Sequence, residues 1–488
     1  MTQSSVEPKT SAEDAGSGSR TPAGRSWLDR YFHISERGSS VATEVRGGVT
    51  TFMAMAYILL LNPLILSGKD VDGNLLGQPA LITATALAAA ATTLLMGFWG
   101  KVPLALAAGL SVSGVMASQV VPVMTWPQAM GMSVAYGAVI CLLVVTGLRE
   151  MIMNAIPLAL KHAITIGIGL FIAIIGFVKA GFVHENPAPG GGPVSLGPAG
   201  ELQGWPVLIF AVTLLLIFAL QARNIPGAIL IGIVVGTVVA VILNAVADIP
   251  AKAWFSGPPE LHGSAVSAPD FSLLGEVSFS GWGDVGYITI TMIVFTLVLA
   301  GFFDAMATIL GVGTEARLAD DKGRMPGLSK ALFIDGAGGV IGGGVGASGQ
   351  TVFVESATGV GEGARTGLAS AVTGGFFALC LFFTPLTAIV PQEVAAAALV
   401  VIGSMMMQNA KHVDWSDRSV AIPVFLTVVL MPFTYTITTG VAAGVISYAV
   451  IKTAQGKARE VGAFMWGLTA IFVVYFAIHP IESWLGVG

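Results

Sequence analysis

Charge is scarce in this sequence. Only 10% of its 488 residues are Asp, Glu, Lys or Arg, whereas 54% are hydrophobic. Soluble domains carry about 25% charged residues, so this composition excludes an ordinary soluble protein. The long apolar stretches predict instead an all-α polytopic membrane protein embedded in a lipid bilayer. The net charge of −5 carries little information, because orientation depends on where the basic residues lie.

Cysteine is scarce too, and several functional motifs are missing. Cys141 and Cys380 both fall in apolar stretches, which favours packing roles over a disulfide or a metal pair. The sequence contains no glycine-rich phosphate loop, no nucleotide-binding signature and no metal-ligand spacing, which argues against an ATP-driven pump. No nucleophile–base pair is visible either, so an enzyme is disfavoured. We expect no cofactor, no bound metal and no nucleic-acid partner.

Apolar stretches of about 20 residues are long enough to cross a bilayer, and they predict about fourteen transmembrane spans. We place the spans near residues 48–66, 80–99, 103–121, 128–148, 161–179, 205–221, 226–246, 287–311, 328–346, 350–365, 366–384, 387–407, 418–434 and 436–453. Fourteen spans divide into two halves of seven. Because seven is an odd number, the two halves would cross the membrane in opposite orientations, so we expect inverted 7+7 repeats. A further apolar stretch, 461–485, is expected to be an extra C-terminal helix that either crosses the membrane or lies along the other helices.

The N-terminal residues are more polar than the rest. Residues 1–25 are rich in Ser, Thr, Gly, Pro and charge without periodicity, which predicts a disordered tail. Residues 26–47 are predicted to form an interfacial segment, because Trp27, Tyr31 and Phe32 suit the level of the lipid headgroups.

Basic residues are distributed unevenly between the predicted spans. If the N-terminus is inside, all of the 23 Lys and Arg residues lie in inside segments except Lys69, Lys179 and Lys252. Cytoplasmic segments carry an excess of Lys and Arg, so this asymmetry predicts a cytoplasmic N-terminus. The expected location is the plasma (inner) membrane, with a multi-pass topology.

Two acids fall inside apolar stretches in the second half of the chain. Asp304 is the one charge in residues 287–313, and Glu355 follows a glycine-rich run within residues 338–364. An isolated carboxylate in hydrocarbon costs at least roughly 3 kcal/mol, so it normally faces a cavity, a partner or a substrate. Two such acids therefore indicate a transport site. The alternative is that each is a protonated or hydrogen-bonded acid with a packing role.

The residues around Glu355 predict a broken helix. Residues 351–354 favour an extended backbone, and a helix can begin at Ser356. The third span, 107–121, has a similar Gly/Ser-rich opening and occupies the same place in its half. We expect spans 3 and 10 to be half-helices with short extended leads, as in transporters whose helix N-termini offer N–H groups to a ligand. For 107–121, a packed glycine-containing helix is the alternative.

Polar and aromatic residues near the two acids are candidate ligands. Thr351 and Ser356 flank the acid of the tenth span and are able to hydrogen-bond a ring. Phe302 or Phe303, together with Phe353, could stack on a planar ligand, although aromatics in a membrane span more often only pack. They are predicted substrate contacts on this basis.

Two further polar residues have less definite roles. Asp335, in the ninth span, belongs either to a polar network under the site or to the framework of the span. Thr308 lies one turn after Asp304 and either supports that carboxylate or bonds back to its own helix, the interpretation we favour.

These stretches resemble the nucleobase/ascorbate transporter superfamily, and specifically its adenine/guanine/hypoxanthine permease branch. The similar segments are TEVRGGVTTFMAMAYILLLNP (43–63), HAITIGIGLFIAIIGFVKAG (162–181), FFDAMATILGVG (302–313), ALFIDGAGGVIGGGVGASGQTVFVESATGVGEGARTGL (331–368) and FLTVVLMPFTYTITTGVAAGVISYAVIK (425–452). The resemblance extends from about residue 30 to about residue 453. It implies a core domain (48–148 and 287–384) and a gate domain (161–246 and 387–453). It also implies proton-coupled purine uptake, an elevator-type motion and a homodimer.

By position, the resemblance makes Glu355 the substrate carboxylate of the tenth span. Asp304 corresponds to an eighth-span aspartate, and both acids are expected to take part in proton coupling. The chain departs from the branch at Gly301, where a second aspartate is usual, and at Ser113, where the third span usually carries Asn. The Thr that usually follows the retained aspartate is Ala305. We therefore expect Ser113 to contact the substrate in a site less polar than the family pattern.

The sequence thus predicts a secondary transporter that imports an uncharged purine base, such as guanine, hypoxanthine or adenine, with protons. One alternative is a transporter of another small planar or anionic solute, because half-helix N-termini favour anions. A second alternative is a passive channel, for which uptake would be indifferent to uncouplers.

Overall fold

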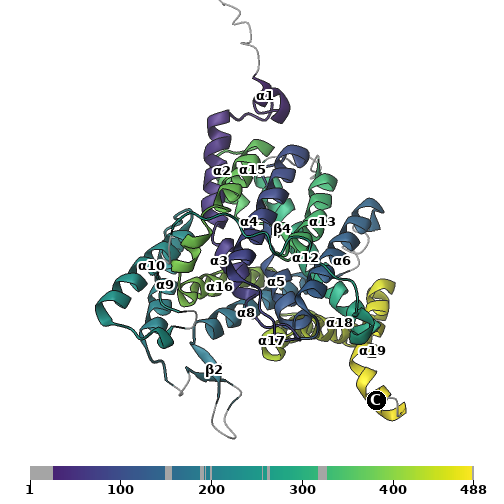
Figure 1. Cartoon of the computed structure of the whole chain (residues 1–488). Coiled ribbons are helices and arrows are strands. Elements are labelled where there is room, and N and C mark those ends of the chain that lie inside the picture. Colours follow the sequence, from purple (N-terminus) through teal and green to yellow (C-terminus); the bar gives the residue numbers. More distant parts are fainter. Residues whose placement is uncertain are drawn as a thin grey trace, which may run out of the picture.

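The computed structural model describes residues 26–148, 156–186, 192, 194–197, 201–254, 257–260, 264–316 and 327–485 (Figure 1). Within these ranges, the side chains of residues 288, 303, 304, 306, 307, 310, 311, 314, 315 and 478–485 are outside the described part. The predicted tail, 1–25, is outside it as well.

Helices make up most of the described chain. The α-helices are α1 (Trp27–Phe32), α2 (Val41–Met55), α3 (Ile58–Ile65), α4 (Gln78–Leu95), α5 (Leu110–Val115), α6 (Trp126–Val145), α8 (Leu158–Lys179), α9 (Trp205–Ala222), α10 (Ala228–Ala247), α11 (Trp282–Val285), α12 (Tyr287–Glu315), α13 (Leu328–Val345), α14 (Ser356–Gly361), α15 (Gly367–Cys380), α16 (Gln392–Met406), α17 (Arg418–Thr434), α18 (Ile437–Ala454) and α19 (Ala463–Leu485). Short π or 3-10 turns are η1 (Met96–Gly100), η2 (Met116–Val120), η3 (Ala251–Ala253), η4 (Thr384–Ile389), η5 (Met407–His412) and η6 (Ala458–Glu460). The strands are β1 (Leu106–Ala108), β2 (Val183–Glu185), β3 (Val194–Leu196) and β4 (Gln350–Val352).

Many of these helices have the length and composition of membrane spans. In the described ranges, 8 helices are long and apolar enough to cross a membrane, and shorter apolar helices accompany them. The count of fourteen spans and the inverted repeat stay predictions, since hydropathy and length do not establish them.

The helix that contains the first predicted span begins at Val41, before residue 48. Ser40 is the N-cap of α2, and its hydroxyl oxygen accepts a hydrogen bond from the backbone N–H of Thr43 at 3.2 Å. This cap starts the helix at Val41, inside the segment that was expected to lie at the interface. The same span is interrupted at Ala56 and Tyr57, where α2 ends and α3 begins.

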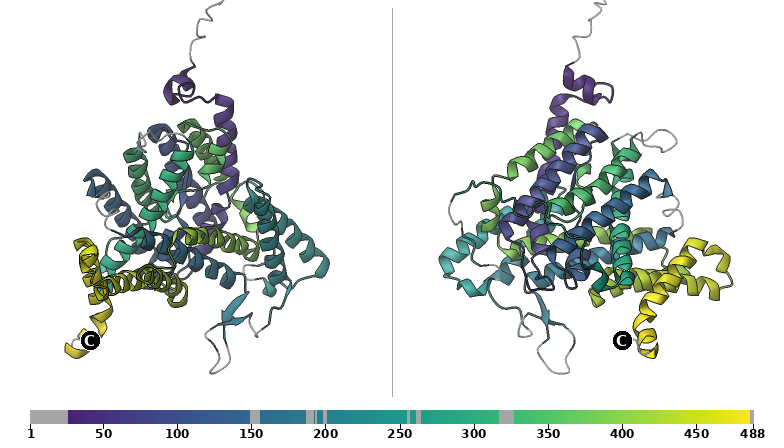
Figure 2. Two further views of the ribbon diagram at one scale, coloured as in Figure 1. Left: turned by 180° about the vertical axis from the view of Figure 1, so that it is seen from behind. Right: turned by 45° about the vertical axis from the view of Figure 1, so that its right-hand side comes forward.

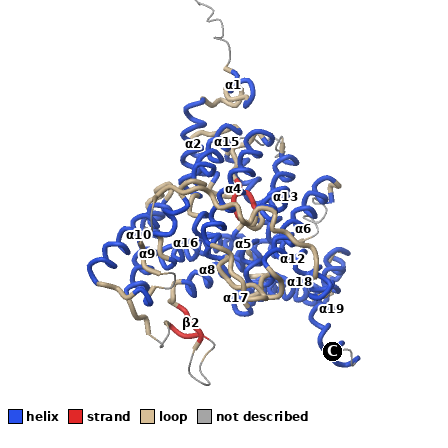
Figure 3. The backbone as a smooth tube through the Cα atoms, in the orientation of Figure 1, coloured by secondary structure: helices blue, strands red, loops and turns tan. Residues whose placement is uncertain are grey.

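The extended leads predicted in spans 3 and 10 are present, and they pair with each other. Strand β1 precedes α5, strand β4 precedes α14, and the two strands are antiparallel with Ala107 opposite Thr351. Beyond the strands, the N–H of Gly109 donates to the carbonyl of Gly349 at 2.9 Å. A Cβ at Gly109 would lie 2.8 Å from the side chain of Thr351, so this crossing requires a glycine. Figure 3 shows the pair in red, enclosed by helices.

Packing divides the helices into two groups. In what we name the core group, α13 packs on α6, α15 packs on α4 and α2, and the β1–β4 pair contacts α4 and α12–α13. In the gate group, α16 packs on α8 and α9, and α17 packs on α8 and α18. Helix α19, formed by the predicted extra segment, packs beside α18 at the edge of the molecule (Figure 2). Whether α19 crosses a membrane stays open.

Candidate functional site

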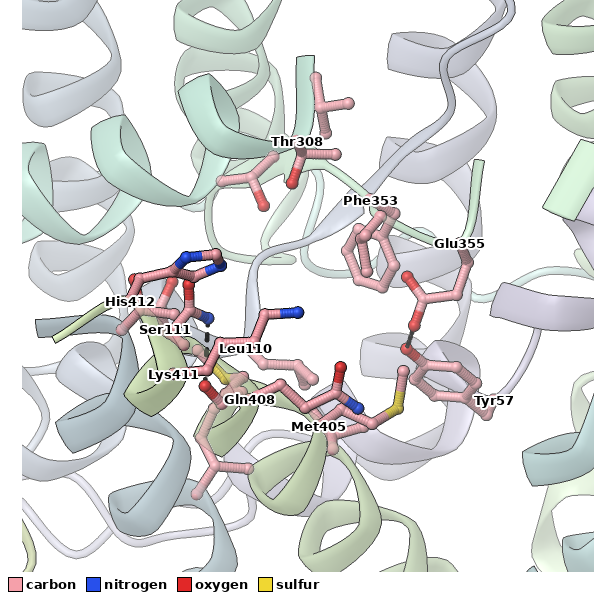
Figure 4. A pocket seen from close by; sticks show the side chains of 18 residues that line it. Tyr57, Leu110, Ser111, Thr308, Phe353, Glu355, Met405, Gln408, Lys411 and His412 are labelled. Atoms are coloured by element: carbon pink, nitrogen blue, oxygen red, sulfur yellow. Dashed lines mark hydrogen bonds between the residues drawn. The ribbon is translucent and has the colours of Figure 1, made fainter. Parts of the chain in front are cut away.

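A cavity of about 370 Å³ lies between the core group and the gate group (Figure 4). Its core side is formed by Tyr57, Leu110, Ser111, Thr308, Thr351, Val352, Phe353, Val354 and Glu355, and its gate side by Thr165, Ile172, Ile402, Met405, Met406, Gln408, Asn409, Lys411 and His412. The β1–β4 crossing therefore delivers backbone and side chains directly to one wall of the cavity.

Glu355 is placed on that wall by the strand that precedes it. The N–H of Phe353 donates to the carbonyl of Ala105 at 2.9 Å, which extends the pairing of β4 to the residue before the turn. Glu355 is the N-cap residue of α14 and is half-buried. Its carboxylate oxygen Oε1 accepts a hydrogen bond from the hydroxyl of Tyr57, whose side chain is buried. The rings of Tyr57 and Phe353 are 6.5 Å apart and inclined by 44°.

The gate wall carries cationic and amide side chains. Lys411 and His412 lie on the opposite side of the cavity from Glu355 in Figure 4, and both are exposed. His162, on α8, stacks on His412 with ring centroids 5.1 Å apart, and its Nδ1 lies 3.3 Å from Oδ1 of Asn409. These contacts hold η5 against α8. The cavity thus presents a carboxylate on one side and hydrogen-bond donors on the other.

Three of the predicted substrate contacts come together at this cavity, namely Thr351, Phe353 and Glu355. Thr308 also lines it, and the favoured bond of Thr308 to its own helix stays a prediction. The carboxylate, a hydroxyl and an aromatic ring therefore share one wall. This arrangement suits a planar ligand that carries N–H groups.

Two other predicted contacts, Ser113 and Ser356, do not line the cavity. The hydroxyl of Ser113 donates to Oδ1 of Asn62 at 2.7 Å and lies 2.8 Å from the hydroxyl of Ser348. The hydroxyl of Ser356 donates to the carbonyl of Phe353 at 2.7 Å and accepts from the N–H of Ala105 at 3.0 Å. Both side chains are fully buried, and they fix the backbone of the broken spans. Direct contact with a substrate stays a prediction for both.

The remaining predicted contacts, Phe303 and Asp304, have side chains outside the described residues. Their roles stay predictions, while the backbone of α12 passes the cavity at Thr308. Gly301 is described, and a Cβ built there would lie 3.4 Å from the ring of Tyr136 and 3.6 Å from Val112. Neither neighbour lines the cavity. The departure at Gly301 therefore concerns packing inside the core group more directly than the polarity of the cavity.

Sequence reasoning missed Tyr57 and the polar residues of η5. Tyr57 stands in a run of aliphatic residues, and only Pro63, which removes a backbone donor and disfavours a continuous helix, signalled an interruption nearby. The run Gln408, Asn409, Lys411 and His412 lies between the predicted spans 387–407 and 418–434, in an inside segment. Nothing in the sequence indicates that this run turns toward Glu355.

At the other end of α8, polar contacts join the two groups. The ammonium group of Lys179, on α8 of the gate group, donates to the hydroxyl of Ser67, which follows α3, at 2.8 Å. Within the gate group, the side-chain amide of Gln392 donates to the backbone carbonyl of Lys179 at 2.9 Å. At 1.5 Å per residue, Lys179 lies about 25 Å along the helix from His162 at the cavity rim. The hydroxyls of Thr296 on α12 and Thr438 on α18 form a second link, 2.7 Å apart. The groups are therefore tied together away from the rim.

Comparisons with known proteins agree with this architecture. A model described as Permease family matches residues 42–443. The adenine permease AdeP of Escherichia coli (strain K12) is 34% identical over 455 residues, which are 93% of this chain and 96% of AdeP. The guanine/hypoxanthine permease PbuG of Bacillus subtilis (strain 168) is 36% identical over 459 residues, which are 92% of this chain and 99% of PbuG.

Among solved structures, the transmembrane domain of a cyanobacterium bicarbonate transporter, BicA, has a similar fold. The TM-score is 0.58 and the sequence identity 18%, and the match covers 82% of this chain and 97% of that domain. At this identity the likeness concerns the fold alone. The apolar helices and the match to the permease family model together indicate an integral multi-pass membrane protein.

Proposed function

The chain belongs to the nucleobase/ascorbate transporter family of permeases, and from this premise we propose that it imports a purine base through the cavity beside Glu355. Its relatives are named as purine permeases, which supports nucleobase transport. The finer features of the proposal are proton coupling, an elevator-type motion and a homodimer.

The observation that carries the proposal is the carboxylate of Glu355 at the cavity wall. A purine base has ring N–H groups or an exocyclic amine, which a carboxylate accepts through charge-assisted hydrogen bonds. The ring of Phe353 offers a face for stacking, and the amides of Gln408 and Asn409 can bond the far edge of the base. The volume of about 370 Å³ lies within the usual range for sites of small molecules.

The arrangement of the two groups supports an inward-open state. With the orientation predicted from the basic residues, η5 is at the cytoplasmic end of its span, so the cavity opens toward the cytoplasm. The contacts of Lys179 with Ser67 and of Thr296 with Thr438 then close the outer side. An elevator motion would carry Glu355, on the core group, past the gate group to the outside. Protons are the proposed coupling ion because the acids of the core group are carboxylates at membrane depth.

Uptake of a radiolabelled base in cells that lack purine transport tests this proposal. We expect hypoxanthine, guanine or adenine to compete for uptake, external acid to stimulate it, and a protonophore to abolish it. Cells with the empty vector provide the background. Uptake that follows a sodium gradient and ignores the proton gradient would refute proton coupling. Uptake that is indifferent to both would indicate a channel.

A second candidate, transport of a planar anionic solute, is favoured by Lys411 and His412 on the gate wall. An anion would place its charge near these side chains and away from Glu355. The same competition assay separates the two candidates, because an anionic ring such as orotate would then compete better than any neutral purine.

A further inference from the structure

Tyr57 and Glu355 are separated by almost 300 positions in the sequence and joined by a hydrogen bond at the cavity wall. Tyr57 occupies the interruption between α2 and α3, where the N–H groups of Leu59 and Leu60 bond to carbonyls three residues back. This tight turn directs the buried ring of Tyr57 at the carboxylate (Figure 4). The hydroxyl thus points at the group that would receive the substrate.

Both partners of this bond belong to the core group. Helix α3 packs on α4 and β1, and β4, which leads to Glu355, packs on the same two elements. A motion of the core group relative to the gate group would carry Tyr57 and Glu355 together. The bond can therefore persist in both the inward-open and the outward-open state. A ligand at the carboxylate would make the bond less important, because the ligand would then supply other donors to Glu355.

A carrier that takes up its substrate repeatedly must return empty after each delivery. In the proposed elevator motion, the carboxylate of Glu355 would make this return without a substrate N–H to accept, past apolar side chains of the gate wall such as Ile172 and Ile402. A charged group that loses its hydrogen bond in such surroundings is costly. When a base is bound, its own N–H groups bond the carboxylate, which has acceptor sites for several donors.

On the basis of the proposed function, we infer that the Tyr57 hydroxyl substitutes for the substrate at Glu355 while the carrier returns empty. Tyr57 is then a positioning residue for the return step, and the substrate-loaded step does not depend on it. Loss of one hydrogen bond to a charged group slows the empty return by about 10- to 150-fold if nothing replaces it.

The test compares two modes of transport by purified protein in the same proteoliposome preparation. Net uptake of radiolabelled hypoxanthine into empty vesicles needs the empty return, whereas exchange against unlabelled hypoxanthine inside does not. For Tyr57→Phe, which removes only the hydroxyl, we expect the ratio of net uptake to exchange to fall by about 10-fold or more. Because this is a ratio within one preparation, it does not depend on how much variant is folded.

Tyr475→Phe on α19 is the matched control, since it removes a hydroxyl from a side chain that does not line the cavity. Its ratio should equal that of the wild type. The inference is overturned if Tyr57→Phe leaves the ratio unchanged, either because net uptake and exchange both persist or because both fall by the same factor. It is also overturned if Tyr57→Phe abolishes exchange. If the wild type itself exchanges no purine, the proposed function is wrong. That result is distinguishable from a failure of the inference about Tyr57, because it is seen in the wild type without any variant.

Discussion

Replacing Glu355 by Gln is the most direct perturbation of the proposed site. The amide has nearly the shape of the carboxylate, and its oxygen can still accept the hydroxyl of Tyr57. In that orientation the NH₂ group takes the place of the second carboxylate oxygen and meets the N–H of a purine, donor against donor. One hydrogen bond to a charged group, worth about 1.5–3 kcal/mol, is then lost, and the affinity falls by about 10- to 150-fold.

The opposite orientation of the amide sets the lower limit. The NH₂ group of Gln would then face the oxygen of Tyr57, and the amide oxygen would accept the N–H of the purine. A neutral hydrogen bond contributes about 1 kcal/mol, roughly 1 kcal/mol less than the charged one, so the affinity falls by about 5-fold. We therefore expect a loss of binding between about 5- and 150-fold, with the folded amount unchanged.

Equilibrium binding of radiolabelled hypoxanthine to purified protein measures this loss of affinity directly, because binding does not depend on a proton gradient. Glu362→Gln is the matched control, because the carboxylate of Glu362 forms an exposed ion pair with Arg46 at 2.9 Å. Exposed pairs contribute about 0–1 kcal/mol, and this one is not part of the cavity wall. Wild-type affinity in Glu355→Gln would refute the assignment of this carboxylate. A loss of folded protein that parallels the loss of binding would show that Glu355 has a packing role.

Two further predictions concern contacts away from the cavity. Lys179→Met removes the charged donor to Ser67, so the inward-open arrangement should lose about 1.5–3 kcal/mol. The measurement is the labelling of Gln408→Cys by a maleimide from the inner side, with Cys141 and Cys380 replaced by Ala. We expect the labelling to slow, and unchanged labelling would contradict the closing role. Burial raises the pKa of Asp70, but N–H groups of Asn74, Trp126 and Asp72 outweigh burial and hold the pKa below its usual value. A carboxyl group whose pKa is depressed by folding adds stability that is complete above its unfolded pKa and is lost as the pH falls through the folded pKa. The melting temperature of the wild type should therefore fall more than that of Asp70→Asn as the pH drops below about 4, and parallel curves would contradict this.

Sequence alone identified the family, the class of helical multi-pass membrane protein and the part of the chain that forms one wall of the cavity. These features depend on local properties. Spans follow from runs of apolar residues, and the position of Glu355 follows from an extended stretch ahead of a helix start. The pairing of β1 with β4 is a consequence of two such stretches lying at the same depth.

Tertiary structure decided which side chains meet. The sequence did not indicate that the hydroxyl of Ser113 bonds to Asn62 and Ser348, and its contact with a substrate stays a prediction. The sequence also did not predict that Tyr57 and His412 line the same cavity as Glu355. The physical reason is that membrane spans are apolar all round, so their sequences carry little amphipathic signal to show which face is turned inward. The contacts between the groups depend on packing between helices distant in the chain, and this packing places Glu355 opposite Lys411.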